Sequence, residues 1–128
     1  MPATVELSAR TDAVINGAQV ELRGKFEREP TETHLEGELD DVNLPAGSAV
    51  SFCLVQGGST VPLAVGVVQE EDQRKAQFEL RSDQGQSVPN VQVGNMLQAR
   101  DGANGNMADC TRPLILAATF APDEESGH

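Results

Sequence analysis

The sequence predicts an all-β fold, an antiparallel two-sheet β-sandwich of about eight strands, Ig-like or jelly-roll-like, with no long helix. Three observations predict it. Apolar and polar residues alternate in several short runs, which is the pattern of half-buried strands. Turn residues separate these runs at the spacing of a sandwich or barrel. No window carries a sustained apolar repeat of 3.6 residues, the period that a long helix would show.

Three runs alternate strictly and predict strands with one wet face: 19–29, 33–41 and 75–81. In 19–29, for example, the apolar positions include Val20 and Phe26, and their neighbours in the run are charged or polar. Such strands place one face on the core and the other in water.

Three further runs are apolar on both faces, at 49–55, 61–68 and 113–120. Strands of this kind lie at central positions, or their outer face is covered by something else. Residues 4–9 and 95–100 are the shorter strand candidates.

Glycine-rich pairs mark the tight connections. Asn16-Gly17 is the strongest hairpin signal because both residue types tolerate positive φ. Gly57-Gly58 separates two apolar strands in the same way. The remaining breaks fall at 44–47, 70–73 and 82–86, and residues 86–95 predict an extended loop or an irregular edge strand.

The chain of 128 residues is expected to form one domain over 1–120. Its four phenylalanines fall on the apolar parity of their own strands, which predicts that all four belong to the core: Phe26, Phe52, Phe78 and Phe120. Residues 121–128 are expected to form an acidic disordered tail or to be a cloning remnant.

Two cysteines, Cys53 and Cys110, lie far apart in the chain and outside any CxxC motif. With two histidines in the whole sequence, a structural zinc site of the usual Cys/His kind is disfavoured. A Cys53–Cys110 disulfide is the preferred interpretation, and two unrelated thiols are the alternative. The disulfide predicts an oxidising compartment, so the protein is expected to be secreted, periplasmic or otherwise extracellular.

The formal net charge of −11 disfavours nucleic acid and anionic membrane surfaces as partners. The apolar run near the C-terminus, "PLILAA", is far too short to insert into a membrane. The first ten residues lack the basic and apolar regions of a signal peptide. Two alternatives stay open: a cytoplasmic chain, or a mature chain whose leader is replaced by Met1.

No enzyme motif occurs, and the protein is expected to be non-catalytic with no cofactor. His34 lies on the charged face of its strand, which indicates a solvated surface histidine rather than a catalytic base. Carbohydrate is a disfavoured ligand because the chain has no Trp or Tyr to stack on sugars.

The stretch "DGANGNMADC" contains four oxygen-bearing side chains of the types that calcium prefers: Asp101, Asn104, Asn106 and Asp109. Their spacing differs from that of an EF-hand, and no Glu stands at the twelfth position. The same residue types are ordinary in turns, so a plain connection is the preferred interpretation. Calcium binding at this loop remains the alternative.

The N-terminal segment "ATVELSARTDAVI" can form a strand that completes a neighbour's sheet, although pairing within its own chain is the simpler expectation. The leading hypothesis is therefore a non-catalytic structural, assembly or adhesion domain. Its expected partner is a protein or a second copy, with self-association through the N-terminal strand. The alternative is a small binding module that uses calcium through residues 101–109.

The run "LEGELDDVNLPAGSAVSFCLV", followed by "KAQFELRSDQGQSVPNVQVGNMLQARDG", resembles secreted bacterial β-modules of chordin-type (CHRD-like) character. The resemblance covers roughly residues 18–120 and consists of strand alternation with an "LPAG"-type turn. The paired-histidine motif of that family is missing, so no functional residue is carried over. The resemblance implies an extracellular, non-catalytic β-sandwich.

Overall fold

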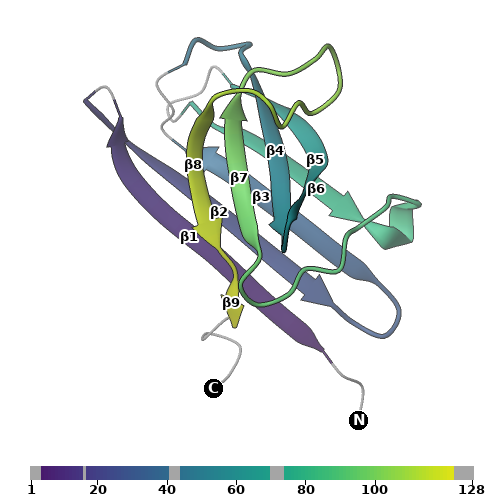
Figure 1. The fold of residues 1–128 in the computed structure, drawn as a ribbon. Helices are drawn as coiled ribbons and strands as arrows, with labels where there is room; N and C mark the ends of the chain where they lie inside the picture. The colour runs from purple at the N-terminus through teal and green to yellow at the C-terminus, as the bar shows by residue number, and fades with distance from the viewer. Residues whose placement is uncertain (1–3, 16, 41–43, 70–73, 123–128) are drawn as a thin grey trace.

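A computed structural model describes residues 4–15, 17–40, 44–69 and 74–122, and it confirms the predicted all-β sandwich. Two antiparallel sheets pack face to face (Figure 1). Sheet A has the strand order β6-β3-β2-β1-β9, and sheet B has the order β5-β4-β7-β8. No α-helix occurs in the part of the chain that the structure describes.

The strand bounds follow the runs that alternate or are apolar throughout. Sheet A consists of β1 (Val5–Ile15), β2 (Ala18–Arg28), β3 (Thr33–Asp40), β6 (Ala76–Arg81) and the short β9 (Ala121–Pro122). Sheet B consists of β4 (Ala49–Gln56), β5 (Ser59–Val67), β7 (Met96–Asp101) and β8 (Leu114–Thr119). One turn of 3-10 helix, η1 (Ser82–Gln84), occupies the turn predicted after β6.

Strands β1, β2 and β3 form a meander. Two residues join β1 to β2, as the Asn16-Gly17 signal predicts, and Gly17 has the positive φ of 83° that such a turn requires. Gly57, with φ of 60°, lies in the equally short connection between β4 and β5. Asn16, residues 41–43 and the predicted turn at 70–73 lie outside the described residues.

The end of the chain joins sheet A. Ala121 and Pro122, which the sequence assigned to the acidic tail, pair with Ser8 and Leu7 of β1. The fold therefore extends two residues beyond the predicted end of the domain, while the rest of the tail, 123–128, lies outside the described residues.

The core lies between the sheets and contains all four phenylalanines, which confirms their predicted position. Phe26, Phe52 and Phe120 are fully buried, and Phe78 is nearly so. The rings of Phe52 and Phe78 lie 4.7 Å apart between centroids, so the two sheets contact each other through an aromatic pair.

Glycines in two strands of sheet A let a side chain of sheet B enter deeply. Gly24 and Gly37 are directly paired across β2 and β3. A Cβ atom at Gly24 would lie 2.7 Å from Leu97 Cδ2, and one at Gly37 would lie 3.1 Å from the same atom. The two absent side chains leave the room that Leu97 fills, which explains two glycines in the middle of paired strands.

Candidate functional site

The two outer faces of the sandwich differ sharply in charge. Arg100 and Asp101 are the only charged residues in the strands of sheet B. In sheet A, by contrast, the outward positions of β2 and β3 are mostly charged, and the register places them in rows across the sheet. Among the described residues, the charged side chains of the strands therefore lie mainly on the outer face of sheet A.

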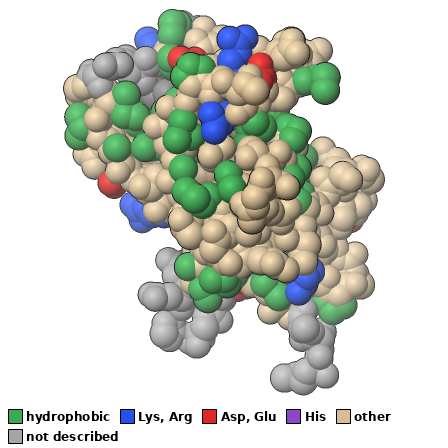
Figure 2. Space-filling model, viewed as in Figure 1, with side chains coloured by type: hydrophobic (Ala, Val, Ile, Leu, Met, Phe, Trp, Pro, Cys, Tyr) green, Lys and Arg blue, Asp and Glu red, His purple; other side chains and the backbone are tan. Residues whose placement is uncertain are grey.

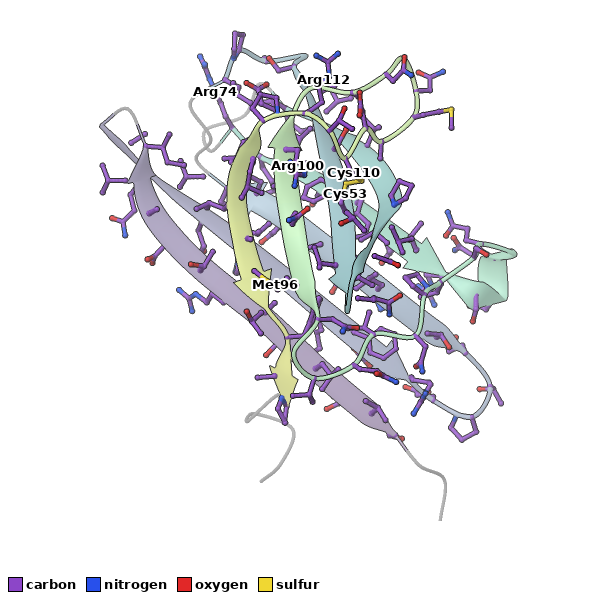
Figure 3. All side chains as sticks on the ribbon, viewed as in Figure 1. Cys53, Arg74, Met96, Arg100, Cys110 and Arg112 are labelled. Atoms are coloured by element: carbon purple, nitrogen blue, oxygen red, sulfur yellow. A yellow bond between two sulfur atoms is a disulfide. The ribbon has the colours of Figure 1, made fainter. Side chains whose placement is uncertain are left out.

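The predicted disulfide is present and connects β4 to the long loop between β7 and β8. Cys53 and Cys110 are bonded with a Cα–Cα distance of 6.1 Å. We call residues 102–113 the disulfide loop. Cys53 is fully buried although it points to the outer side of sheet B, because this loop lies over it (Figure 3).

Hydrogen bonds hold the disulfide loop on the same strand. The Ser51 hydroxyl donates to the carbonyl of Gly102 at 2.6 Å and accepts from the Asp109 N–H at 2.9 Å. The Gly102 N–H donates to the carbonyl of Ala49 at 3.0 Å. Together with the disulfide, these bonds explain why β4 is apolar on both faces: its outer face is covered by the chain's own loop.

The disulfide loop also holds the residues of the calcium hypothesis. Asp101 ends β7 and is exposed. Asn104 exchanges two backbone hydrogen bonds of 3.0 Å with Met107, so Asn106 lies at the tip of a tight turn. Asn104 and Asp109 both line a hollow of about 210 Å³ beside Pro62 and Cys110, which Asp101 and Asn106 do not line. Calcium binding stays a prediction.

The carboxylate of Asp109 already has partners inside the loop. Its Oδ1 accepts hydrogen bonds from the Thr111 hydroxyl at 2.6 Å and the Thr111 N–H at 3.0 Å. These bonds, with the nearby Arg112 guanidinium, hold the pKa of Asp109 below its usual value. The arrangement is an Asx-type turn, the role that the plain-connection interpretation assigns to these residues.

The lowered pKa of Asp109 predicts a loss of stability in acid. Because the pKa of Asp109 is lower in the folded state than in the unfolded state, its ionised carboxylate makes a stabilising contribution. This contribution is fully present above the unfolded pKa, about 4. It is lost as pH falls through the folded pKa. Thermal melts between pH 5 and pH 2 should therefore show a smaller acid-induced drop in Tm for Asp109→Asn than for the wild type. The control is the same substitution at the exposed Asp12. Equal acid-induced drops in Tm for the wild type and Asp109→Asn would contradict the prediction.

Beyond the disulfide loop, the outer face of sheet B exposes several apolar side chains to solvent. Figure 2 views the molecule from this side and shows hydrophobic side chains over the sheet, with acidic ones mostly near the margins. Val67 and Leu114 are 50% and 51% exposed, at the ends of β5 and β8. Val65, Met96 and Ala117 lie on the same face by register and are partly exposed.

The two arginines at this face donate hydrogen bonds to uncharged groups, and Arg112 also lies 3.6 Å from Asp109. Arg100 donates to the Gln98 amide oxygen at 3.1 Å and to the Arg112 carbonyl at 2.7 Å. Arg112 donates to the Ala103 carbonyl at 3.0 Å (Figure 3). These arginines hold the disulfide loop against β7, so their first role is structural.

The outer face of sheet A carries a network of ion pairs. Arg23 pairs with Glu38 and Asp40, and Lys75 lies 3.6 Å from Glu38. Desolvation opposes the charge of Arg23, but its hydrogen bond to Asp40 and the nearby carboxylates raise the pKa of Arg23 above its usual value. A shallow depression of about 700 Å³ opens on this face, crossing β1, β2, β3 and β6.

His34 lies beside this depression and is less solvated than the sequence predicts. Its side chain is 18% exposed, and its Nε2 atom lies 2.9 Å from Glu79 Oε2 on β6. The sequence separates these two residues by 45 positions, so only the β3–β6 pairing brings them together. The signal that could have pointed to this site is the pairing of two strands whose wet faces both carry acids.

The N-terminal strand is paired within its own chain. All eleven residues of β1 pair with β2, from Val5 with Arg28 to Ile15 with Ala18. On its other side, Leu7 and Ser8 pair with β9, and the residues from Ala9 to Ile15 have no strand partner in the described part of the chain. Self-association through this segment would therefore use the open edge of β1.

No protein-family model, no curated protein and no solved structure matches this chain. The resemblance to chordin-type domains accordingly stays a prediction. Among the described residues, no helix is long and apolar enough to cross a membrane.

Proposed function

We propose that this chain is a non-catalytic structural or adhesion domain of the extracytoplasmic space that associates with a second copy through the outer face of sheet B. The observation that carries the proposal is the set of exposed or partly exposed apolar side chains on the two edge strands of this sheet, Val65 and Val67 on β5 and Leu114 on β8. Apolar side chains that stay exposed on one face of a domain mark a candidate interaction site.

Charge favours the same face. Two copies with a net charge of −11 repel each other, and the repulsion is smallest where they approach through surfaces with few charges. The strands of sheet B offer such a surface, with Arg100 and Asp101 as their only charged residues. A self-complementary apolar patch on each copy is the requirement of a two-fold interface.

The disulfide supports the proposed location. Structural disulfides persist in oxidising compartments and are rare in the cytosol, so Cys53–Cys110 favours a secreted or periplasmic protein. A rigid covalent loop beside the apolar face also suits an interface, because little order must be gained on binding.

The interface is tested by placing two negative charges on it. The double variant Val67→Glu/Leu114→Glu changes two half-exposed side chains, so its folding and Tm should stay close to those of the wild type. Light scattering coupled to size exclusion should show concentration-dependent association of the wild type and monomers for the double variant, because buried like charges oppose the contact.

The control is Val14→Glu, which adds one negative charge at an exposed valine of β1, on the opposite face. It should associate as the wild type does. A wild type that is monomeric at several hundred micromolar would overturn the proposal. Association that Val14→Glu disrupts and the double variant preserves would place the interface at the open edge of β1 instead.

A further inference from the structure

Three side chains on the outer face of sheet A direct metal-ligating atoms toward one point. His34 and Glu36 lie two positions apart on β3, and Glu79 lies opposite them on β6. His34 Nε2 lies 2.9 Å from Glu79 Oε2 and 3.9 Å from Glu36 Oε2. All three ligand atoms fall within 4.8 Å of one another.

These separations are close to those that a small divalent ion requires. Zinc binds imidazole nitrogen and carboxylate oxygen at about 2.0–2.2 Å, so tetrahedral ligand atoms stand roughly 3.3–3.6 Å apart. The two His34 distances lie on either side of that range. The side chains of Glu36 and Glu79 are 45% and 50% exposed, so they can rotate and change these distances without movement of the strands.

The two carboxylates face each other without a Lys or Arg ion pair. Glu36 and Glu79 are direct partners in the β3–β6 register, where like charges destabilise a sheet. All nine Lys and Arg residues lie in the described part of the chain, and none has a nitrogen within 4.0 Å of either carboxylate. A cation held between the two would remove this repulsion.

The other outward acids of β2 and β3 each have a Lys or Arg partner: Glu21, Glu27, Glu38 and Asp40. Lys25 is the register partner of Glu36, but its Nζ atom lies 3.7 Å from Glu27 instead. The lack of a cationic partner is therefore specific to the pair beside His34 within these two strands.

The surroundings leave room for further ligands. Glu36 and Glu79 line the depression of about 700 Å³, together with Ser8 and Lys25. Three ligands from paired strands with an open side are typical of zinc sites that keep a position for water or another ligand.

We propose that His34, Glu36 and Glu79 bind a divalent transition-metal ion, for which Zn²⁺ is the probe, with the remaining coordination position facing the depression. The imidazole nitrogen selects this class of ion over Ca²⁺ and Mg²⁺, which take oxygen ligands. The ion would connect β3 to β6, the edge strand of sheet A, and stabilise that edge.

The test is calorimetric titration of the full-length, metal-free protein with ZnCl₂, together with melts in the presence and absence of zinc. We expect one ion per chain and a Tm that rises with zinc concentration, because the ion binds the folded state. His34→Ala, Glu36→Gln and Glu79→Gln should each weaken binding at least about tenfold. The glutamine variants keep the size of the side chain and should fold normally.

Three controls separate this site from adventitious binding. Glu38→Gln, on the same strand, should leave zinc affinity unchanged, and Lys25→Gln should leave it unchanged or raise it by removing a nearby positive charge. His128→Ala removes the only other imidazole of the chain and should also bind as the wild type does.

Wild-type binding in His34→Ala, or loss of binding in His128→Ala, would overturn the proposal. A wild type that neither binds zinc in the titration nor changes its Tm would overturn it as well. The proposal is independent of the interface on sheet B, because the ligands lie on the opposite face of the sandwich.

Discussion

Replacing Cys53 and Cys110 together by alanine should lower the free energy of unfolding by about 4 kcal/mol, because the unfolded chain regains the freedom that a closed loop of 57 residues denies it. For a domain of this size the loss corresponds to a fall in Tm of roughly 10–20 °C. The disulfide also fixes the loop that covers Ser51 and the outer face of β4, so its loss exposes apolar surface as well.

Thermal and urea unfolding of the oxidised wild type, the reduced wild type and the double variant measure the effect. The reduced wild type should resemble the double variant, since both lack the cross-link but differ in side-chain volume. Alkylation of the natively purified protein should find no free thiol. A double variant with the stability of the oxidised wild type would contradict the prediction.

Truncating Leu97 to alanine should cost about 2–5 kcal/mol, the usual range for a fully buried leucine. Leu97 is completely inaccessible to solvent and occupies the space above Gly24 and Gly37. Its removal leaves a cavity between the sheets that neither glycine can fill. Urea denaturation monitored by circular dichroism measures the loss.

Gly24→Ala tests the same contact from the other side. On its own it should cost about 1–3 kcal/mol, because the new Cβ would lie 2.7 Å from Leu97 Cδ2. In the Leu97→Ala background it should cost less, since that atom is gone and the methyl group fills part of the cavity. The double-mutant cycle therefore predicts a favourable coupling between the two substitutions.

Gly58→Ala is the matched control, because a Cβ at Gly58 would meet nothing within 4 Å. Its effect should stay within about 0.5 kcal/mol. Additive costs at Gly24 and Leu97, with no coupling, would show that the close approach of these two residues does not determine the packing.

The fold was predictable where the sequence alternates. The parity of Phe26 within β2 and of Phe78 within β6 assigned both rings to the core without knowledge of the pairing, because each face of a strand follows from a period of two. The short connections at Gly17 and Gly57 were predictable from backbone preference. Strand β9 was missed, because two residues that include a proline carry no alternation.

The candidate sites were predictable to different degrees. The disulfide followed from counting cysteines, and the apolar strands pointed to a covered or interacting face. Which loop covers Cys53 did not follow, because that depends on how β7 and β8 place residues 102–113 over β4. His34 and Glu79 are distant in sequence, and their contact requires β6 to pair with β3 across an intervening hairpin of the other sheet.

The disulfide also limits how the domain responds to force. Leu7 lies beside Pro122, so tension applied to the two ends of the sandwich acts first on the short β1–β9 pairing and separates it residue by residue. The segment from Cys53 to Cys110, a sequence separation of 57, would span about 190–205 Å if it were free to extend. The cross-link prevents this extension. A domain under tension would therefore unfold first at its terminal strands, while β4 stays bonded to the disulfide loop.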